Sequence, residues 1–508
     1  MHIWKYMVLM FHKAWLPVVV AGVLMSSGEG AVAADKALNI AQDDATDMQA
    51  LPARVTLGFE RLRLPDDEHV GLLGASYVVE LAPGWWFGPA LYGAATGRRG
   101  GLFTWGAEGQ RRWRLGDRWE AVAGVYVGGG GGAGAPVGGG LMLRPHVDLM
   151  LDFGGWATGI SASQVRFPSG AIHSTQFGLL VTVPDTFAFT APGRAGQSVE
   201  FTGAGGLGAD RMQVTAGHYA SGSTGGRSLG YAGMRLERQL GHEVSATLEA
   251  AGAATGGADG YAEVLGGALA LWPIGSEAIR VGLRAAIGLG GGGAVLTGGG
   301  PIAKTALLGR VQMGRQLSIE LETGRARAFR GDFSTAYAQL SVGMALGEAP
   351  AEAGAAAAAR VVHDMEWSVS VQDYLHAQRK DGSTRSLSTL GLKFRRSLSE
   401  HLYLSGEAHS AVAGSAGAYS AGLVGLGTTI RMTAFEPWSV GAEAMVGAAG
   451  GGGVASRGGA IAQPMVWIAR DLGRYSRLKV GAGYVKSLRG GLSSPVIDMT
   501  WAFAFGTP

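Results

Sequence analysis

Residues Val496 to Phe505, close to the end of the chain, read Val-Ile-Asp-Met-Thr-Trp-Ala-Phe-Ala-Phe and alternate between two classes of side chain. One class is large and apolar: Ile497, Met499, Trp501, Phe503 and Phe505. The other is small or polar: Val496, Asp498, Thr500, Ala502 and Ala504. Because successive side chains of a strand point to opposite faces, the stretch predicts a β-strand with one face in an apolar medium and the other in a smaller or wetter space.

The composition extends this interpretation to the rest of the chain. Of 508 residues, 88 are Gly, and a Gly inside a helix costs about 1 kcal/mol relative to Ala, so helices are disfavoured throughout. The glycines have no three-residue period, which excludes collagen. The absence of Cys excludes disulfides, thiol catalysis and Cys-ligated zinc. A net charge of +3 without a basic run gives no indication of nucleic-acid binding.

The N-terminus has the pattern of a secretory signal peptide over residues 1–33. Basic residues precede the apolar stretch Ala14 to Met25, and Ala31-Val32-Ala33 offers small residues for cleavage. The alternative is an uncleaved membrane anchor. Residues 34–51 are polar, without periodicity, and are expected to be a flexible mature N-terminus. No later window holds 18 consecutive apolar residues, so no transmembrane helix is expected.

Internal similarity divides the mature chain into three units of about 160 residues. Ser174-Thr175-Gln176-Phe177 recurs as Ser334-Thr335-Ala336-Tyr337 and as Ser494-Pro495-Val496-Ile497. A glycine run recurs in the same register, at Gly128 to Gly132, Gly290 to Gly293 and Gly450 to Gly453. We therefore expect β repeats at residues 52–190, 196–346 and 365–505, with a linker at residues 347–364.

Each unit divides into eight segments of about ten residues, bounded by Gly, Pro and Asp. Turns after even segments are short and loops after odd segments are longer, as in outer-membrane barrels. A sheet in lipid must close into a barrel, because unpaired backbone groups are costly there. The sequence therefore predicts an all-β transmembrane antiparallel barrel of about 24 strands. The alternative is three tandem eight-stranded barrels, each filled by its own side chains. Five tryptophans are expected at interfacial depth at the short-turn end: Trp85, Trp86, Trp113, Trp119 and Trp156.

These features resemble bacterial outer-membrane β-barrel proteins of the porin-like class. The resemblance rests on the signal peptide, the lack of Cys and the alternating last strand that reaches Phe505. It implies a bacterial outer-membrane location, contact with membrane lipid and lipopolysaccharide, and recognition of the last strand by the barrel-assembly machinery. The chain departs from the class by continuing past the terminal aromatic residue with Gly506-Thr507-Pro508.

Two groups of basic residues are candidate sites. The loop before the last strand of each unit is basic. Because the donors of Arg match phosphate, we expect these residues to contact lipopolysaccharide or another anion; the alternative is that they are ordinary solvated loop tips. The residues are Arg166, Arg327, Arg330, Lys486 and Arg489. A second group is expected to line a lumen and attract anions, or else to snorkel or form salt pairs; its members are Arg111, Arg112, Arg114, Arg395 and Arg396.

The glycine runs lack a following Lys-Ser/Thr, so they are expected to be flexible outer loops or close-packed strand ends rather than phosphate cradles. The 11 His show no metal-ligand or catalytic spacing. Glu249 and Glu407 recur in two units and indicate lumen or structural groups. We therefore expect no catalytic residue, metal or cofactor. The predicted function is a passive channel or export conduit, with a possible periplasmic export partner; the alternative is a non-conducting structural or surface-interaction barrel.

Overall fold

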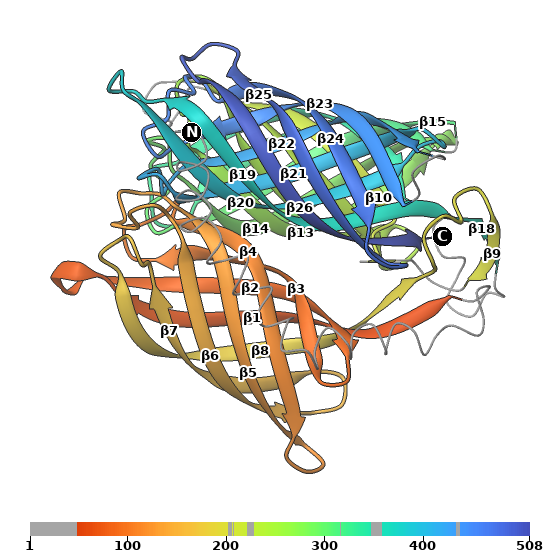
Figure 1. The fold of residues 1–508 in the computed structure, drawn as a ribbon, viewed down its shortest axis with the longest axis horizontal. Helices are drawn as coiled ribbons and strands as arrows, with labels where there is room; N and C mark the ends of the chain where they lie inside the picture. The colour runs from red at the N-terminus through yellow and green to blue at the C-terminus, as the bar shows by residue number, and fades with distance from the viewer. Residues whose placement is uncertain are drawn as a thin grey trace, which may run out of the picture.

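The computed structural model describes residues 48–201, 206, 208–220, 228–314, 316–346, 358–432 and 437–507. The predicted signal peptide lies outside these residues, as do residues 34–47 of the predicted N-terminal segment and most of the predicted linker. Within the described residues no helix is long and apolar enough to cross a bilayer. The described fold consists of three closed, antiparallel, eight-stranded barrels and one two-stranded sheet (Figure 1).

Barrel 1 comprises β1 (Gln49–Arg63), β2 (His69–Ala82), β3 (Trp85–Thr96), β4 (Phe103–Arg114), β5 (Trp119–Gly131), β6 (Met142–Asp152), β7 (Ala157–Arg166) and β8 (His173–Phe189), with the 3₁₀ helix η1 (Pro65–Asp67) after β1. Barrel 2 comprises β10 (Arg211–Tyr219), β11 (Leu229–Gln239), β12 (Val244–Thr255), β13 (Ala262–Ile274), β14 (Ser276–Gly291), β15 (Pro301–Met313), β16 (Leu317–Ala328) and β17 (Ser334–Ala345). Barrel 3 comprises β19 (His363–Gln378), β20 (Thr384–Ser397), β21 (Leu402–Ala413), β22 (Ser420–Arg431), β23 (Trp438–Gly450), β24 (Ala460–Asp471), β25 (Ser476–Ser487) and β26 (Ser493–Thr507).

The prediction of a single 24-stranded barrel is wrong, and the alternative of three eight-stranded barrels is what the structure shows. Each repeat closes on itself because its first strand pairs antiparallel with its last. The registers include Val55 opposite Val183, Thr215 opposite Ser341 and Val369 opposite Trp501. These pairings satisfy the backbone groups of both edge strands within one repeat, so no edge of the described barrels remains to join the next repeat.

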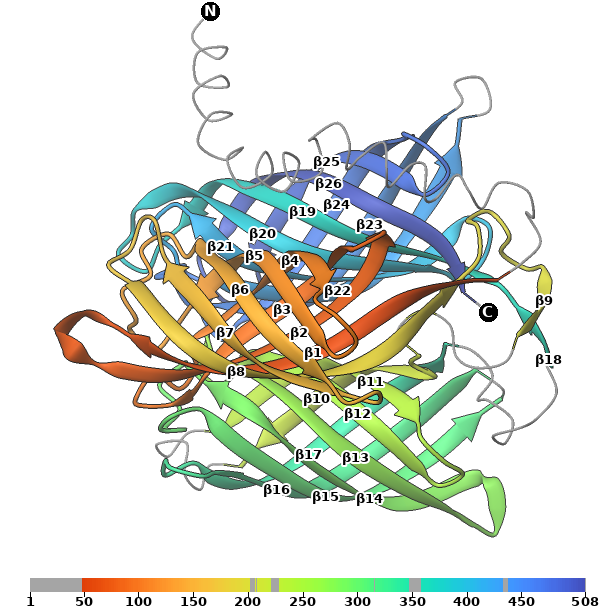
Figure 2. The ribbon, with the colours of Figure 1, turned by 90° about the horizontal axis from the view of Figure 1, so that it is seen from below.

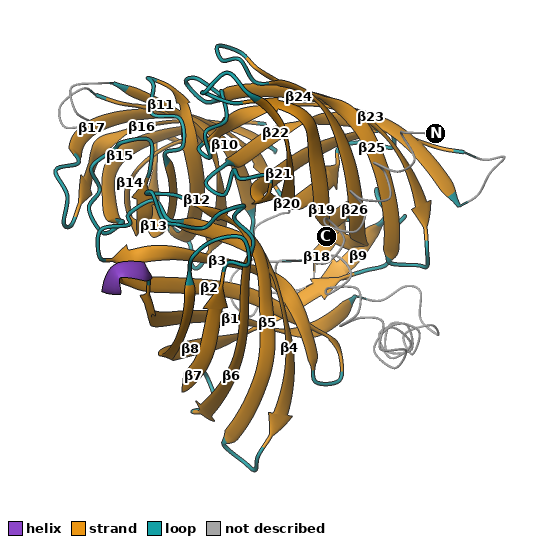
Figure 3. Cartoon of the chain, turned by 60° about the vertical axis from the view of Figure 1, so that its left-hand side comes forward, coloured by secondary structure: helices purple, strands orange, loops and turns teal. Residues whose placement is uncertain are grey.

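The three barrels lie side by side with their long loops at one common end, which we call the loop rim (Figures 2 and 3). The other end, the turn rim, holds short turns such as Pro83-Gly84. Near it, β9 (Ser198–Phe201) pairs with β18 (Ala358–Val361), which connects the two segments that join the barrels. The loop and turn asymmetry therefore runs in the same direction in all three barrels.

The alternation of side chains along the strands separates an apolar outside from a polar inside. In β26, Val496 and Asp498 are buried in barrel 3, whereas Ile497 is exposed on its outer face. The outer faces of other strands carry exposed large apolar side chains, among them Val147, Leu149, Ile160, Phe177, Leu179, Leu283, Ile287, Leu307, Leu321 and Leu340. Buried charged side chains such as Glu60, Arg235 and Asp498 lie on the inner faces. This distribution is the reverse of that of a water-soluble domain.

The tryptophans expected at the turn rim follow two patterns. Trp85, Trp113, Trp119 and Trp156 are exposed at or beside the ends of their strands, as expected of interfacial residues. Trp86 instead is buried inside barrel 1, where the guanidinium of Arg112 lies 5.3 Å from its ring centroid.

The predicted flexible N-terminus is ordered from Gln49 onward, because residues 49–51 extend β1 and pair with the end of β8. Aromatic side chains pack where β8 meets barrel 3: the Phe187 ring lies 4.9 Å from Trp367 and 5.2 Å from Phe505. Phe505, the last aromatic residue of the chain, is therefore buried against barrel 1.

The glycine runs close a ring of contacts among the three barrels at the loop rim. The run of barrel 1 lies against the β21–β22 loop of barrel 3, where a Cβ added to Gly131 would come 2.4 Å from the carbonyl oxygen of Gly417. The run of barrel 3 lies against the β12–β13 loop of barrel 2, and a Cβ on Gly450 would come 2.1 Å from the nitrogen of Gly260. The run of barrel 2 lies against the β3–β4 loop of barrel 1, and a Cβ on Gly101 would come 2.2 Å from the nitrogen of Gly292.

Each barrel thus gives its glycine run to one neighbour and receives the run of the other, as in a cyclic trimer built from one chain. Backbone hydrogen bonds cross two of these junctions: Gly100 N–H donates to Gly298 O at 3.1 Å, and Gly417 N–H donates to Gly138 O at 3.0 Å. Of the two interpretations offered for the glycine runs, close-packed strand ends describes them, since a Cβ on Gly129, Gly131, Gly291 or Gly450 would collide with the neighbouring barrel.

Candidate functional site

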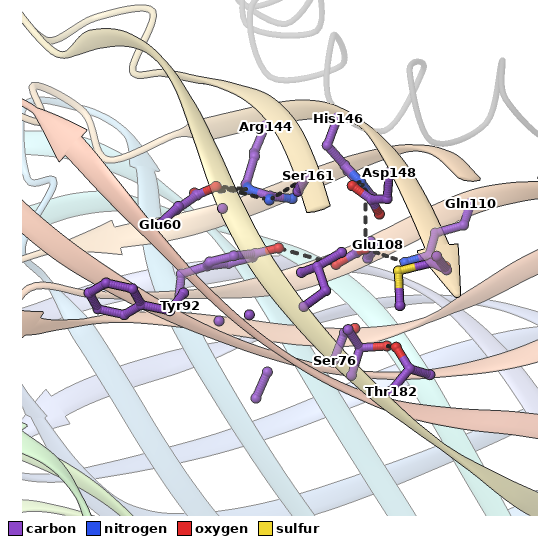
Figure 4. A pocket seen from close by; sticks show the side chains of 18 of the residues that line it. Glu60, Ser76, Tyr92, Glu108, Gln110, Arg144, His146, Asp148, Ser161 and Thr182 are labelled. Atoms are coloured by element: carbon purple, nitrogen blue, oxygen red, sulfur yellow. Dashed lines mark hydrogen bonds and ion pairs between the residues drawn. The ribbon is translucent and has the colours of Figure 1, made fainter. Parts of the chain in front are cut away.

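The interior of barrel 1 is crossed by an ion pair and its polar neighbours. The guanidinium of Arg144, on β6, donates from Nε and Nη2 to the two carboxylate oxygens of Glu60, on β1, each at 3.0 Å. The Ser163 hydroxyl donates to the same carboxylate at 2.7 Å. The guanidinium and the carboxylate are both almost completely buried, and Figure 4 shows them facing each other across the interior.

A second group in barrel 1 is centred on His146, whose ring lies between two carboxylates. Its Nδ1 is 2.9 Å from Asp148, and its Nε2 is 3.2 Å from Glu108, the second being an ion-pair distance without good hydrogen-bond alignment. The space between these side chains that the centre of a water molecule can occupy is about 30 Å³. Because one water needs roughly 10–15 Å³ of such space, the cavity holds two or three waters and no larger solute.

Barrel 2 contains a denser network in which cations and carboxylates alternate. Arg235, on β11, contacts three glutamates: Glu249 at 2.7 Å, Glu320 at 2.7 Å and Glu322 at 2.6 Å. None of these four side chains is more than 1% exposed. Among the described residues of barrel 2, the network pairs five cations with five carboxylates: Arg211, Arg235, Arg284, Lys304 and Arg310 with Glu237, Glu249, Glu263, Glu320 and Glu322.

Aromatic rings complete the filling of barrel 2 toward the loop rim. The ammonium group of Lys304 contacts Glu263 at 2.5 Å and lies 4.5 Å from the ring centroid of Tyr231. The hydroxyl of Tyr219 donates to the same glutamate at 2.7 Å. The ammonium group of Lys304 is fully buried, and its charge is balanced by the carboxylate and by the faces of the aromatic rings.

Barrel 3 repeats one pair of barrel 2, since Lys393 and Glu407 lie opposite each other on neighbouring strands as Arg235 and Glu249 do, and is otherwise filled by its own residues. Lys393 lies 3.0 Å from Glu407 and 3.1 Å from Asp498. The guanidinium of Arg395 stacks 3.7 Å from the ring centroid of Tyr403. The cavity beside these residues offers about 20 Å³ to the centres of water molecules, which is room for no more than one or two waters.

The residues predicted to line a lumen take three different positions. Arg112 and Arg395 point into barrels 1 and 3, but Arg112 is paired with Glu120 at 2.7 Å and Arg395 is stacked on Tyr403. Arg111 points outward, with its guanidinium 5.1 Å from the ring centroid of Trp85, and donates to Pro83 O at 2.6 Å.

Arg114 and Arg396 also lie outside the interiors. Arg114 is exposed at the turn rim, and Arg396 is buried between barrels 3 and 2, where it donates to Leu346 O at 3.2 Å. The prediction that all five arginines line a lumen is corrected accordingly: consecutive residues of a strand alternate between the two faces, so Arg111 and Arg112, or Arg395 and Arg396, never share one.

The basic residues of the strand 7–8 loops all lie at the loop rim and are exposed to the surroundings. Arg327 is on the outer face of β16, while Arg166 and Lys486 lie near the ends of β7 and β25. Arg330 and Arg489 lie in the loops that follow. None of the five makes an ion pair with another described side chain, so their charges are available to a ligand; phosphate binding there stays a prediction.

The sequence interpretation missed most of the buried ionic network. Glu249 and Glu407 were expected to be lumen or structural groups, and each is buried in a barrel and ion-paired. The alternation Ser318-Ile319-Glu320-Leu321-Glu322 is a signal that Glu320 and Glu322 face inward, whereas the cations that meet them come from distant strands. Within the described part of the chain, no group of three or more His, Asp or Glu side chains is arranged to hold a metal ion.

Comparison with known proteins gives only distant structural likenesses. No family model matches the chain, and no curated protein sequence matches it. Among solved structures, Pseudomonas aeruginosa OccK5 (OpdH) matches at 10% identity over 91% of this chain and 98% of its own, with a TM-score of 0.22. The outer membrane protein opdK of the same species matches at 9% over 90% and 99%, with a TM-score of 0.21. Acinetobacter baumannii OccAB3 matches at 8% over 91% and 99%, with a TM-score of 0.22.

Proposed function

We propose that this chain is a bacterial outer-membrane protein whose three closed barrels conduct no solute and form one rigid body with a structural or surface-interaction role. The membrane location is supported by the outer faces, where apolar side chains such as Phe177, Leu307 and Leu321 are 78%, 64% and 61% exposed. Exposed apolar side chains of this size, strand after strand, are stable only in contact with lipid or a partner. The strands are also long enough, since about ten residues cross a bilayer when tilted.

The observation that carries the lack of conduction is the ionic network inside barrel 2. A permeating ion would have to displace the contacts of Arg235 with three glutamates, all of them out of water. Separating buried partners leaves charges uncompensated at a cost of several kcal/mol each. The cavities beside Arg144 in barrel 1 and Lys393 in barrel 3 have room for a few waters only, which supports the same conclusion for these barrels.

A comparison of the three repeats supports a structural role. The glycine contacts at the loop rim occur in every repeat, whereas the interior charges recur only in part. Arg235 with Glu249 in barrel 2 and Lys393 with Glu407 in barrel 3 are ion pairs at corresponding positions of neighbouring strands, but barrel 1 is filled around Arg144 and His146 instead. A transport or catalytic task shared by all three repeats would place equivalent groups in each of them. What the repeats have in common is the way they assemble, and the space among the paired interior groups admits no substrate, which supports a non-enzymatic role.

The test is the conductance of the purified chain in a planar lipid bilayer. We expect no unitary current steps, with insertion verified separately by protection of the strands from protease in vesicles. The passive channel or export conduit, which is the competing function and the one that would need a periplasmic export partner, predicts reproducible ohmic steps. Such steps from verified single insertions would refute the proposed function.

A further inference from the structure

The outer face of β16 changes from apolar to basic along its length. From the turn rim upward its outward-facing side chains are Leu317, Ile319, Leu321, Thr323, Arg325 and Arg327, and all of them are exposed. The burial pattern of the strand alternates, so these six side chains lie in one row on the outside of barrel 2. A row of this kind has the polarity of an amphiphile, with an apolar part toward the bilayer centre and cations at the surface.

Neighbouring strands widen the apolar part of this row. Leu307 and Val311 on β15 and Leu340 and Val342 on β17 are exposed on the same outer face. In register, Leu321 lies opposite Gly309 on one side and Leu340 on the other, so the three strands form a continuous apolar surface. Its area extends from the turn rim to about the level of Thr323.

The cations above this surface make no ion pair with any residue that the structure describes. Arg325 and Arg327 are two residues apart on one face, which places their backbones about 7 Å from each other. Arg330 extends from the following loop, next to the exposed Phe329. Asp332 is the acidic residue of the same loop, and none of the three arginines is paired with it among the described contacts, so three positive charges stand against one negative charge.

We propose that this face of barrel 2, which we call the β16 face, binds a phosphorylated glycolipid of the lipid A type, with its acyl chains on the leucines and its phosphate between Arg325, Arg327 and Arg330. The inference rests on the proposed outer-membrane location. The planar donors of Arg match phosphate oxygens in pairs, and phosphate binding at the membrane surface strengthens with each nearby cation. The occupant is a lipid rather than free phosphate because the cations stand at the end of an apolar surface and not in a polar pocket.

The experiment measures retention of bisphosphorylated lipid A by the full detergent-solubilised chain in native mass spectrometry. The test variant is R325Q/R327Q, and the matched control is R114Q/R118Q, which removes two exposed arginines from the turn rim of barrel 1. We expect the test variant to bind lipid A about 30-fold more weakly, at ~1 kcal/mol for each arginine near a lipid phosphate, and the control to bind like the wild type.

Two further arms identify the source of the phosphate. Dephosphorylated lipid A is expected to bind the wild type and the test variant equally weakly, and millimolar inorganic phosphate is expected not to displace lipid A. Equal retention of lipid A by both variants, or displacement by inorganic phosphate, overturns the proposal. Conductance in the bilayer assay would refute the proposed function while leaving this retention difference intact, so the two failures are distinguishable.

Discussion

Removal of the Arg235 guanidinium is the sharpest test of how barrel 2 is held together. The substitution Arg235→Met keeps the length and apolar volume of the side chain but leaves Glu249, Glu320 and Glu322 without the cation that lies 2.6–2.7 Å from each. Removing one partner from a fully buried ionic group costs about 3–5 kcal/mol, since the remaining charges stay out of water. We expect a loss within this range: the three carboxylates lose their shared guanidinium but keep contacts with Arg284, Lys304 or Arg310.

The control is on the same strand. Arg238→Met removes an arginine that is 48% exposed and lies 3.3 Å from Asp185, and an exposed pair of this kind contributes about 1 kcal/mol or less. Both variants are refolded into phosphatidylcholine vesicles, and urea unfolding is followed by circular dichroism to obtain the free energy of the transition that includes barrel 2. The comparison cancels effects of the membrane and of the refolding protocol.

A third variant separates charge from packing. Arg235→Met combined with Glu320→Leu removes one of the carboxylates that lost its contact with Arg235. Arg310, which also contacts Glu320, keeps its contact with Glu237 at 2.6 Å. We expect the combined variant to recover part of the free energy of unfolding that Arg235→Met loses, because the effects of substitutions at neighbouring residues are not additive. A shift for Arg235→Met no larger than that for Arg238→Met, or no recovery in the combined variant, would refute the argument that buried ion pairing holds the interior of barrel 2.

Three other predictions follow from the loops and the turn rim. Gly101→Ala should destabilise the chain by about 1–3 kcal/mol in the same unfolding assay, because its Cβ meets barrel 2, whereas Gly266→Ala, with nothing within 4 Å, should be neutral. A hydrogen bond from Arg99 lowers the pKa of Glu68, so the η1 loop is stabilised above the ordinary pKa of 4.5 and loses this stabilisation as the pH falls through the lowered pKa. Proteolysis of that loop should therefore become faster at low pH in the wild type. The Arg99→Gln variant should show no such pH transition. Phe505→Ala should lower the free energy of unfolding by about 3–5 kcal/mol and weaken the packing of barrel 3 against barrel 1. The weaker packing should be seen as faster proteolysis of the β8–β9 segment, and an unchanged cleavage rate would contradict the role given to the aromatic cluster.

Strand identity and side-chain orientation were accessible from the sequence because both depend on neighbouring residues. The alternation from Val496 to Phe505 sets which side chains face inward, and the structure agrees. The same parity argument is enough to assign Arg111 and Arg112 to opposite faces of their strand, since adjacent residues cannot share one. The period of about 160 residues also required only a comparison of the chain with itself.

The number of barrels could not be decided in this way. One 24-stranded barrel and three eight-stranded barrels satisfy the same backbone groups with the same strands and turns, so local patterns do not distinguish them. The decision rests on pairings over long sequence distances, such as Val55 with Val183, and on the glycine runs, which fit against a neighbouring barrel only when each repeat has closed.

The repeated strands with an apolar and a polar face follow from the local order of residues, because strand geometry imposes a period of two. The tertiary structure decided where the sheet closes and which charges meet: Arg235 finds Glu320 and Glu322 some 85 residues along the chain, at hydrogen-bond distance. The residues next to Arg235 in the sequence do not indicate which carboxylates it contacts. Any inward-facing cation shows the same local pattern, and only closure of the barrel determines which carboxylate lies beside it.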